Sequence, residues 1–391
     1  MNQQEILANI AAVSDRIRAN ADEAERLGRL PDETEKLLKE SGVTRMLQPK
    51  EWGGMEANPV EFLEAVGAVA KTRCSAAAWV AGVVGLHPFE VGVMDRRAQE
   101  DVWGEDPTVW IASPYVALGR AKKVDGGYIF SGHWTFSSGS ENSHWFHLGG
   151  LLADENGEPL NQDQYHFLIP REDVEIVQDS WQVAGLAGTG SKDLIIRDAF
   201  VPDYRVLEFQ TVVDGTAAAA QGRTEPLYGM PWFVLFGNAV SATVVGICEA
   251  LLDEVIEYQA GRSNVFGEAI KADPYVLPVL GEAASDIEAS RLQILNNVNA
   301  IHQVIARGEE LTTTQRAHVR RDQVRASWRA VAAADRLFGS AGGSAIRLSN
   351  PAQRLWRDAH AGLNHAVNMP GKVYQTSALA QMGVVPEPVL L

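Results

Sequence analysis

The pattern of residues changes character twice along this chain, and that order restricts the fold more than any single motif does. Residues 5–105 carry the apolar spacing and the start and end signals of helices. Residues 108–207 carry alternating and β-branched runs bounded by turn residues. Helical periodicity returns after a connection at residues 214–222 and continues almost to the end. We therefore expect an α+β protein with an N-terminal helical domain (1–107), a central β domain (108–212) and a C-terminal helical bundle (223–391).

Segments within each part predict individual elements. Pro31 and Gly42 mark the start and the end of one helix, and residues 60–84 form an Ala- and Val-rich segment that we expect to be buried on most sides. Residues 124–130 resemble a hairpin, and residues 194–201 a strand that ends at Pro202. A second long bundle helix is expected from about residue 314 to about residue 338. Another long bundle helix precedes it in the sequence. It is predicted by apolar residues that recur at steps of three and four, interrupted by Arg291: Leu277, Leu280, Ala284, Ile287, Ile294, Val298, Ile301 and Ile305.

Composition disfavours several kinds of partner. The 391 residues include 50 acidic and 34 basic side chains, a formal net charge of −16, which works against binding to nucleic acid or to an anionic membrane surface. No apolar stretch is long enough for a membrane span and the first residues lack the apolar core of a signal peptide, so we expect a cytoplasmic protein. The two cysteines, Cys74 and Cys248, are too few for a disulfide framework and should pack as small apolar side chains.

Several familiar catalytic motifs are missing from the sequence. It contains no G-x-G-x-x-G after a strand, no P-loop, no G-x-S-x-G and no H-E-x-x-H. No metal site is expected, because His144 and His147 should point to opposite faces of a strand and His360 and His365 would be about 140° apart on a helix. A Rossmann domain is therefore disfavoured.

Four local groupings remain as candidates, each with a structural alternative. His87 ends the most apolar helix, where an imidazole can be an acid, a base or a donor, or a satisfied helix-end residue. Residues 134–140 combine aromatic and hydroxyl side chains, which suits a planar conjugated ligand or an ordinary strand entering a serine-rich turn. Gly342 and Gly343 can present amides to a phosphate or adenine, or end a helix. His365 lies beside small residues that permit close approach of another group, and taken alone it is structural.

Four motifs in order resemble the acyl-CoA dehydrogenase superfamily along nearly the whole chain. They are residues 49–54 (P-x-x-Y-G-G-like), 183–202 (G-x-R-G-T-x-S … D-V-x-V-P-like), 261–267 (R-x-x-x-F-G) and 351–358 (P-x-x-R-x-x-R-D). The resemblance implies an N-terminal helical domain, a central β barrel or sandwich and a C-terminal four-helix bundle. It also implies a flavin between the β domain and the bundle, in a homotetramer.

Two departures from that superfamily favour a different reaction. The position of the proton-abstracting glutamate, eight residues after Asp358, is Ala366, and the T-E-P-x-A-G-S-D segment is replaced by residues 111–116. The replacements look like the oxygenase components of two-component flavin-dependent hydroxylases that act on phenols. The chain is similar in particular to the seco-steroid hydroxylases of cholesterol catabolism and to the 4-hydroxyphenylacetate 3-hydroxylases, and beyond Asn368 it departs from the former. The shared segments are residues 29–34, 78–80, 97–104, 136–139, 320–326 and 357–362.

This resemblance implies a cofactor, a co-substrate and a partner. Reduced flavin, FMNH₂ or FADH₂, comes from a separate NAD(P)H-dependent flavin reductase and reacts with O₂ to a C4a-hydroperoxide. That species then hydroxylates an electron-rich ring carbon ortho to a phenol. The alternatives are an oxygenase acting on nitrogen, sulfur or an indole ring, a flavin dehydrogenase of acyl thioesters, and a non-catalytic binding protein.

The resemblance also assigns roles to single residues. Ser138 is expected to hydrogen-bond the flavin N5 proton, and His365 to take the phenol proton as the base. His87 and Ser113 are expected to face the hydroperoxide and the substrate hydroxyl. Arg262 is expected to contact the flavin phosphate from a neighbouring subunit, and apolar residues 80–86 should keep water away. The remaining expected flavin contacts are Trp134, Phe136, Ser137, Phe266, Gly342 and Gly343.

Overall fold

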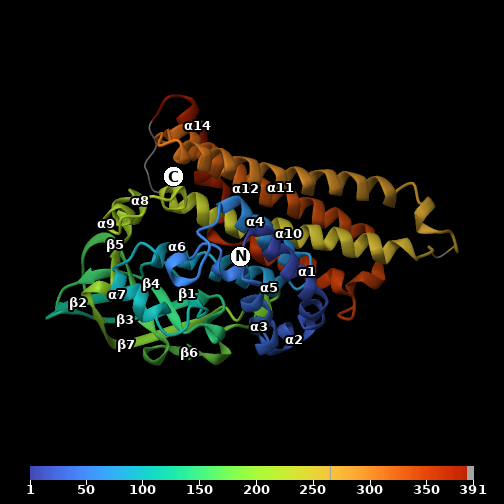
Figure 1. The fold of residues 1–391 in the computed structure, drawn as a ribbon. Coiled ribbons are helices and arrows are strands. Elements are labelled where there is room, and N and C mark those ends of the chain that lie inside the picture. Colours follow the sequence, from blue (N-terminus) through green and yellow to red (C-terminus); the bar gives the residue numbers. More distant parts are fainter. Residues whose placement is uncertain (265, 385–391) are drawn as a thin grey trace.

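The computed structural model describes residues 1–264 and 266–384, and within them the predicted order of helices, sheet and helices is confirmed (Figure 1). Gly42 ends α3 in the left-handed conformation with φ 84°, as the sequence predicts, and Pro31 precedes its first residue. The predicted end of the bundle at residue 391 lies outside the described residues. The N-terminal helices are α1 (Gln3–Ala19), α2 (Ala21–Leu27), α3 (Asp32–Ser41), α4 (Pro59–Ala70), α5 (Ser75–Val84), α6 (His87–Val91) and α7 (Arg96–Trp103).

The Ala- and Val-rich segment at residues 60–84 forms two helices, α4 and α5. Arg73, with φ 64°, turns the chain between α4 and α5, and its guanidinium pairs with Glu254 and Glu257 of the bundle. Every residue of α5 is buried, which confirms the expected burial for this half of the segment. The break lets α4 and α5 pack side by side on the bundle.

A mixed sheet forms the central part of the chain. Its strands run in the order β6-β7-β3-β2-β4-β5-β8, with β1 parallel to β4. The predicted hairpin is β2 and β3, joined so that Val124 pairs with Gly127, and the predicted strand is β7, which ends at Pro202. The strands are β1 (Ile111–Ala112), β2 (Gly119–Val124), β3 (Gly127–Ser137), β4 (Trp145–Ala153), β5 (Pro159–Pro170), β6 (Glu175–Val177), β7 (Lys192–Pro202) and β8 (Val206–Glu208).

Long helices form the C-terminal bundle. Ile287, Ile294, Val298 and Ile301 are buried as predicted, whereas Leu277 is 45% exposed. Within the described part of the chain, α10 alone is long and apolar enough to cross a membrane, and most of it packs inside the protein. The α-helices that follow the sheet are α8 (Phe209–Val213), α9 (Thr216–Ala220), α10 (Trp232–Ala260), α11 (Val276–Ala306), α12 (Thr313–Ser340), α13 (Pro351–Leu363) and α14 (Pro370–Gln381).

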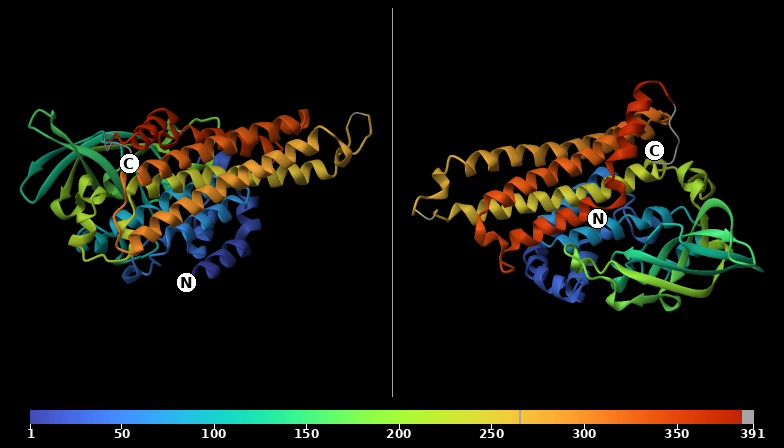
Figure 2. Two further views of the ribbon diagram at one scale, coloured as in Figure 1. Left: turned by 90° about the horizontal axis from the view of Figure 1, so that it is seen from above. Right: turned by 180° about the vertical axis from the view of Figure 1, so that it is seen from behind.

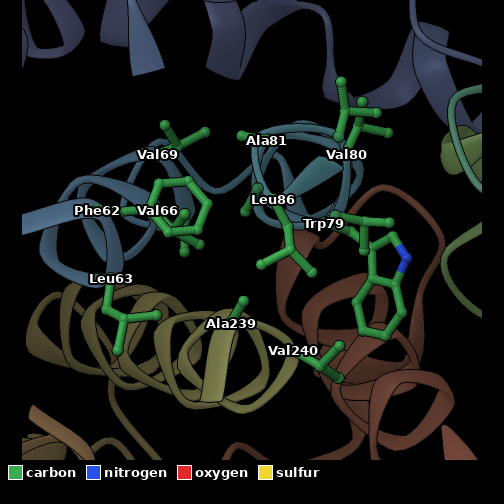
Figure 3. Packing of buried hydrophobic residues seen from close by; sticks show 14 of the residues in the cluster. Phe62, Leu63, Val66, Val69, Trp79, Val80, Ala81, Leu86, Ala239 and Val240 are labelled. Carbon is green, nitrogen blue, oxygen red and sulfur yellow. The ribbon is translucent and has the colours of Figure 1, made fainter. Parts of the chain in front are cut away.

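The bundle extends well beyond the sheet on one side (Figure 2). The N-terminal end of α10 lies near the sheet, and its C-terminal end lies in the projecting part. In Figure 3, Phe62 and Val66 of α4 pack toward α5, while Trp79 of α5 turns its ring nitrogen away from α4. The Trp79 indole stays in the buried core, and its ring nitrogen faces away from α4.

Candidate active site

A chain of hydroxyl groups crosses the junction between α5 and the sheet. The indole N–H of Trp79 donates to Oγ of Ser138 at 3.1 Å, and Oγ of Ser138 lies 2.8 Å from Oγ of Ser191. Oγ of Ser191 lies 2.6 Å from Oγ1 of Thr189, which donates to the carbonyl oxygen of Leu186 at 2.8 Å. These side chains are all buried.

The groups at the two ends of this series of hydrogen bonds determine which atom is the donor in each of its bonds. A carbonyl oxygen only accepts, so the Thr189 proton points to Leu186 and Ser191 must donate to Thr189. Ser138 then donates to Ser191 and accepts from Trp79. A hydroxyl oxygen has two lone pairs. Ser138 therefore keeps one lone pair for a donor from a ligand, as a flavin N5–H group would be.

Two of the sequence motifs, residues 183–191 and 351–358, meet next to this series of hydrogen bonds. Oδ1 of Asp358 accepts from the amide of Leu186 at 2.6 Å, and Leu186 is held at φ 56°. A Cβ on Gly185 would lie 2.4 Å from the carbonyl oxygen of Arg357, so only glycine allows this approach. The segments 183–191 and 351–358 are thus needed together to position Ser191.

The segment of aromatic and hydroxyl residues at 134–140 has both buried and exposed side chains. Phe136, with φ 66°, is 68% exposed and meets Trp181 edge to face at 5.8 Å between ring centroids. Oγ of Ser137 is buried without a hydrogen-bond partner among the described residues. Trp134 differs from the expectation: it is fully buried in the sheet core and donates to the carbonyl oxygen of Gly149 at 2.9 Å. Its ring has no free face for a flavin.

His365 lies at the same junction. Its ring is 5.8 Å from that of Trp79 and 5.7 Å from that of Phe236. Nδ1 of His365 accepts from the amide of Val367 at 3.3 Å, so in the neutral ring the proton is on Nε2. Burial, together with nearby Arg320, lowers the pKa of His365 to about 4. A neutral ring with Nε2–H is a hydrogen-bond donor, which differs from the expected role of base.

His87 continues this group of contacting rings through Tyr115. Nδ1 of His87 is 2.6 Å from Oη of Tyr115, and the Tyr115 ring lies 5.9 Å from that of Phe236. His87 is fully buried, and its Nε2 has no partner among the described residues. Ser113 is also buried, directly after strand β1. A continuous row of contacts therefore runs from Ser138 through Trp79, His365, Phe236 and Tyr115 to His87.

The structure adds a group that the sequence did not predict. Glu90, His147 and His166 are fully buried behind Tyr115, and their ligand atoms lie within 4.8 Å of one another. Glu90 bonds Nδ1 of His166 and accepts from the indole N–H of Trp232 at 3.0 Å. One feature of the sequence could have pointed to this group, because Glu90 is a lone acidic residue in an otherwise apolar segment. His147 and His166 come from two different strands, and their meeting depends on the pairing of β4 with β5.

The expected phosphate contacts lie at the other end of the bundle. Arg262 donates to the carbonyl oxygen of Ala341 at 2.7 Å, and a Cβ on Gly342 would lie 3.6 Å from Nη1 of Arg262. Gly343 follows directly, and Phe266 is 84% exposed nearby in sequence. Phe236 and Ala260 of α10 are separated by about 36 Å at 1.5 Å per residue. Arg262 and Ser138 of one chain are therefore far apart.

The residues around Ser138 and the residues around Arg262 fit different parts of a flavin. The free lone pair of Ser138, the unpartnered Ser137 hydroxyl and exposed Phe136 suit a flat ring with polar edges. A guanidinium beside a glycine with φ 75° suits a phosphate. Because one chain holds these groups far apart, a single flavin would need them from two subunits.

Comparisons with known proteins show the family of the chain. Residues 238–370 match the family described as acyl-CoA dehydrogenase, C-terminal domain. The chain is 48% identical to a pigment production hydroxylase of Rhodococcus erythropolis, over 98% of both chains. It is 40% identical to the oxygenase subunit HsaA of a flavin-dependent monooxygenase of Mycobacterium tuberculosis, over 98% of this chain and 96% of the other. The crystal structure of 3-HSA hydroxylase from Rhodococcus sp. RHA1 superposes with a TM-score of 0.93 at 38% identity, covering 99% of each chain.

Proposed function

The chain belongs to the oxygenase components of flavin-dependent monooxygenases, and from this premise we propose that it hydroxylates a phenol ortho to its hydroxyl group. When bound, reduced flavin supplies the activation of O₂. The observation that carries the proposal is the oriented hydroxyl of Ser138, next to a row of contacting rings that includes His365 and the buried His87.

The side chains at the site would have distinct tasks in this reaction. Ser138 would accept the flavin N5 proton in a hydrogen bond and so hold that proton in place. Ser113 and His87 would face the substrate hydroxyl, and His365 would offer its Nε2–H to the same region. The fully buried helix α5 would keep water from the reacting atoms.

We also propose that the working enzyme is a homotetramer supplied by a separate NAD(P)H-dependent flavin reductase in the cytoplasm. Arg262 and Ser138 lie near opposite ends of α10, and this separation supports a site shared between subunits. Arg262, Phe266, Gly342 and Gly343 of one subunit would then contact the phosphate end of a flavin whose ring lies on Ser138 of another. The name of the M. tuberculosis relative, an oxygenase subunit, supports a separate reductase.

The test is oxygen incorporation from a panel of substrates. The chain is mixed with a flavin reductase, NADH, FMN or FAD and ¹⁸O₂, and each product is examined by mass spectrometry. The panel contains a steroid-derived phenol, 4-hydroxyphenylacetate, resorcinol, indole and an aryl sulfide. A catechol carrying one ¹⁸O atom supports the proposal. Hydrogen peroxide alone with every phenol, oxygenation of only indole or sulfide, or anaerobic oxidation of an acyl thioester would each contradict it.

A further inference from the structure

Arg320 of α12 is a buried cation without an acidic partner. Its side chain is 2% exposed, and in the described part of the chain it forms hydrogen bonds but no ion pair. Its Nε has no hydrogen-bond partner among the same residues. Burial lowers the pKa of Arg320 to about 10, so the guanidinium is still charged at neutral pH. A buried charge without a counter-ion costs stability, so the stability of the fold alone does not account for this residue.

The guanidinium of Arg320 reaches the turn that follows His365. Its Nη2 donates to the carbonyl oxygen of Val367 at 3.4 Å, and the amide of Val367 donates to Nδ1 of His365 at 3.3 Å. We propose that Arg320 is a positioning residue for oxygenation: it fixes the turn that carries His365, and its unpaired charge keeps the His365 ring neutral. This inference rests on the proposed hydroxylation of a phenol at this junction.

Hydrogen bonds connect Arg320 to both ends of that turn. Its Nη1 donates to Oε1 of Gln323, and Nε2 of Gln323 donates to Oδ1 of Asn368 at 2.8 Å. Nδ2 of Asn368 donates to the carbonyl oxygen of Gly362 at 3.1 Å. Gly362 precedes His365 in the chain and Asn368 follows it. The network therefore holds the backbone on both sides of the imidazole.

Helix α10 completes the surroundings of the guanidinium. A Cβ on Gly237 would overlap Nη1 of Arg320, so only glycine admits the arginine at this position. One turn later, Oγ of Ser241 accepts from Gln323 and donates to Oδ1 of Asn368 at 3.1 Å. Arg320 is thus enclosed by neutral groups of α10, α12 and the His365 turn.

Arg320 is the charged group that acts on the His365 ring. The aromatic rings that contact His365 belong to Trp79 of α5 and Phe236 of α10, and neither carries a charge. Burial is the main cause of the low pKa of His365, and the charge of Arg320 lowers this pKa further. The guanidinium therefore disfavours the imidazolium form of His365.

The other titratable groups close to His365 in the chain have partners of their own. Nε2 of His360 pairs with Oδ1 of Asp335 at 2.8 Å, and Oδ1 of Asp358 accepts from the amide of Leu186 at 2.6 Å. None of them is among the groups that shift the pKa of His365. Arg320 alone therefore opposes the protonation of His365 when a negatively charged substrate binds.

A neutral His365 suits the reaction for a chemical reason. An imidazolium beside an ionised phenol is an acid: its N–H bond would break, an O–H bond would form on the phenolate oxygen, and the electron pair of the N–H bond would stay on the ring nitrogen. The phenol ring would then lose electron density at its ortho carbon. A neutral ring with Nε2–H can donate a hydrogen bond without giving up its proton.

The first test reads the ionisation of His365 in the flavin-free protein. Histidine labelled with ¹³C at Cε1 is incorporated, the His365 signal is identified by its loss in His365→Ala, and its chemical shift is followed between about pH 5 and about pH 8. In the wild type His365 should be mostly neutral over this range. In Arg320→Gln its charged fraction at the acid end should rise severalfold. Arg320→Lys keeps the charge, and its His365 titration should resemble that of the wild type.

A second variant tests the charge without removing the arginine. Gln323→Glu places a carboxylate beside Nη1 of Arg320, so it should also raise the charged fraction of His365. The matched control is Arg325→Gln, which makes the same change at an exposed position of α12. It should leave the titration of His365 unchanged.

Turnover supplies the second readout. With 4-methylphenol and reduced flavin, Arg320→Gln should form severalfold less catechol per flavin oxidised than the wild type at the acid end of this range. The yield should recover toward the wild-type value near pH 8, where His365 is neutral in both proteins. A merely structural defect would not recover with pH.

Three results would overturn the inference. The first is an unchanged His365 titration in both Arg320→Gln and Gln323→Glu. The second is a catechol deficit in Arg320→Gln that is equal at every pH. The third is a selective loss of affinity for 4-hydroxyphenylacetate over 4-methylphenol with the titration unchanged, which would make Arg320 a direct ligand of a substrate carboxylate. If the wild type hydroxylates no phenol at all, the proposed function fails, while the titration still decides the effect of Arg320 on His365.

Discussion

The indole N–H of Trp79 donates to Oγ of Ser138 at 3.1 Å, and this bond joins helix α5 to the end of strand β3. It also restricts the serine, since one lone pair of Ser138 is occupied and its proton is directed to Ser191. The remaining lone pair is therefore presented in one orientation. The following predictions test this arrangement and the groups around it.

Ser191→Ala should increase the waste of reduced flavin as peroxide. Without Ser191 the Ser138 proton has no acceptor at 2.8 Å and can turn toward the ligand, so the hydroxyl no longer acts only as an acceptor. We expect a severalfold rise in peroxide per product, smaller than in Ser138→Ala. Peroxide and catechol are measured in the same reaction. Ser131→Ala, which removes a hydroxyl on β3 that pairs with Asp198 of β7, should behave as wild type.

His365→Ala should slow hydroxylation. The neutral ring donates from Nε2, so its loss removes a hydrogen bond at the site, with an expected decrease of about 10²-fold in catechol per flavin. Single-turnover product analysis measures this decrease. His360→Ala removes an imidazole that pairs with Asp335 at the surface, and it is the control. Full hydroxylation in His365→Ala would remove this residue from the reaction.

Stability should fall as the pH is lowered from about 6.5 toward 4. Burial lowers the pKa of His147 and of His365 to about 4, and that of His87 to about 3. Between pH 4 and 6.5 the unfolded chain therefore binds more protons than the folded chain, so the free energy of unfolding rises with pH in this window. Thermal unfolding followed by circular dichroism across the window should show a falling Tm on acidification.

His147→Leu should make the protein less sensitive to acid. Both ring nitrogens of His147 are buried without partners among the described residues, and its folded-state pKa is low. Removing them removes one group that must be neutral in the fold, and should add about 1–3 kcal/mol at neutral pH if the leucine packs as well. The Tm against pH curve of His147→Leu, compared with that of the surface variant His133→Leu, measures this. A steeper acid loss in His147→Leu would contradict the expectation.

Arg262→Ala should weaken flavin binding, and the defect should be repaired between subunits. Mixed oligomers of Arg262→Ala and Ser138→Ala contain sites in which both residues are intact, if one flavin spans two chains. We expect hydroxylation in the mixture to exceed that of either variant alone. Flavin affinity is measured by fluorescence, and Arg307→Ala, a surface arginine paired with Glu309, is the control. No recovery after verified subunit exchange would place both residues in one chain's site or remove Arg262 from it.

The failed expectation for Trp134 shows where a local pattern stops being sufficient. In a regular strand Trp134 and Phe136 would share one face, because side chains alternate with a period of two. The pairing of β3 with β7 shifts register between Trp134 and Ser137, and Phe136 adopts φ 66°. The shift sends one aromatic ring into the sheet core and leaves the other exposed. A bulge of this kind depends on the partner strand, which the spacing of residues along one strand does not report.

The order of helices, strands and helices followed from the sequence alone, because periodicity and turn residues are local properties of the chain. Motif resemblance also named Ser138, His87 and His365 as candidate site residues. Only the tertiary structure decided what these residues can do. Ser191 orients Ser138, Val367 sets the tautomer of His365, and Tyr115 occupies Nδ1 of His87. These partners come from separate helices, strands and turns, and the position of a proton depends on which of them folding brings within hydrogen-bond distance.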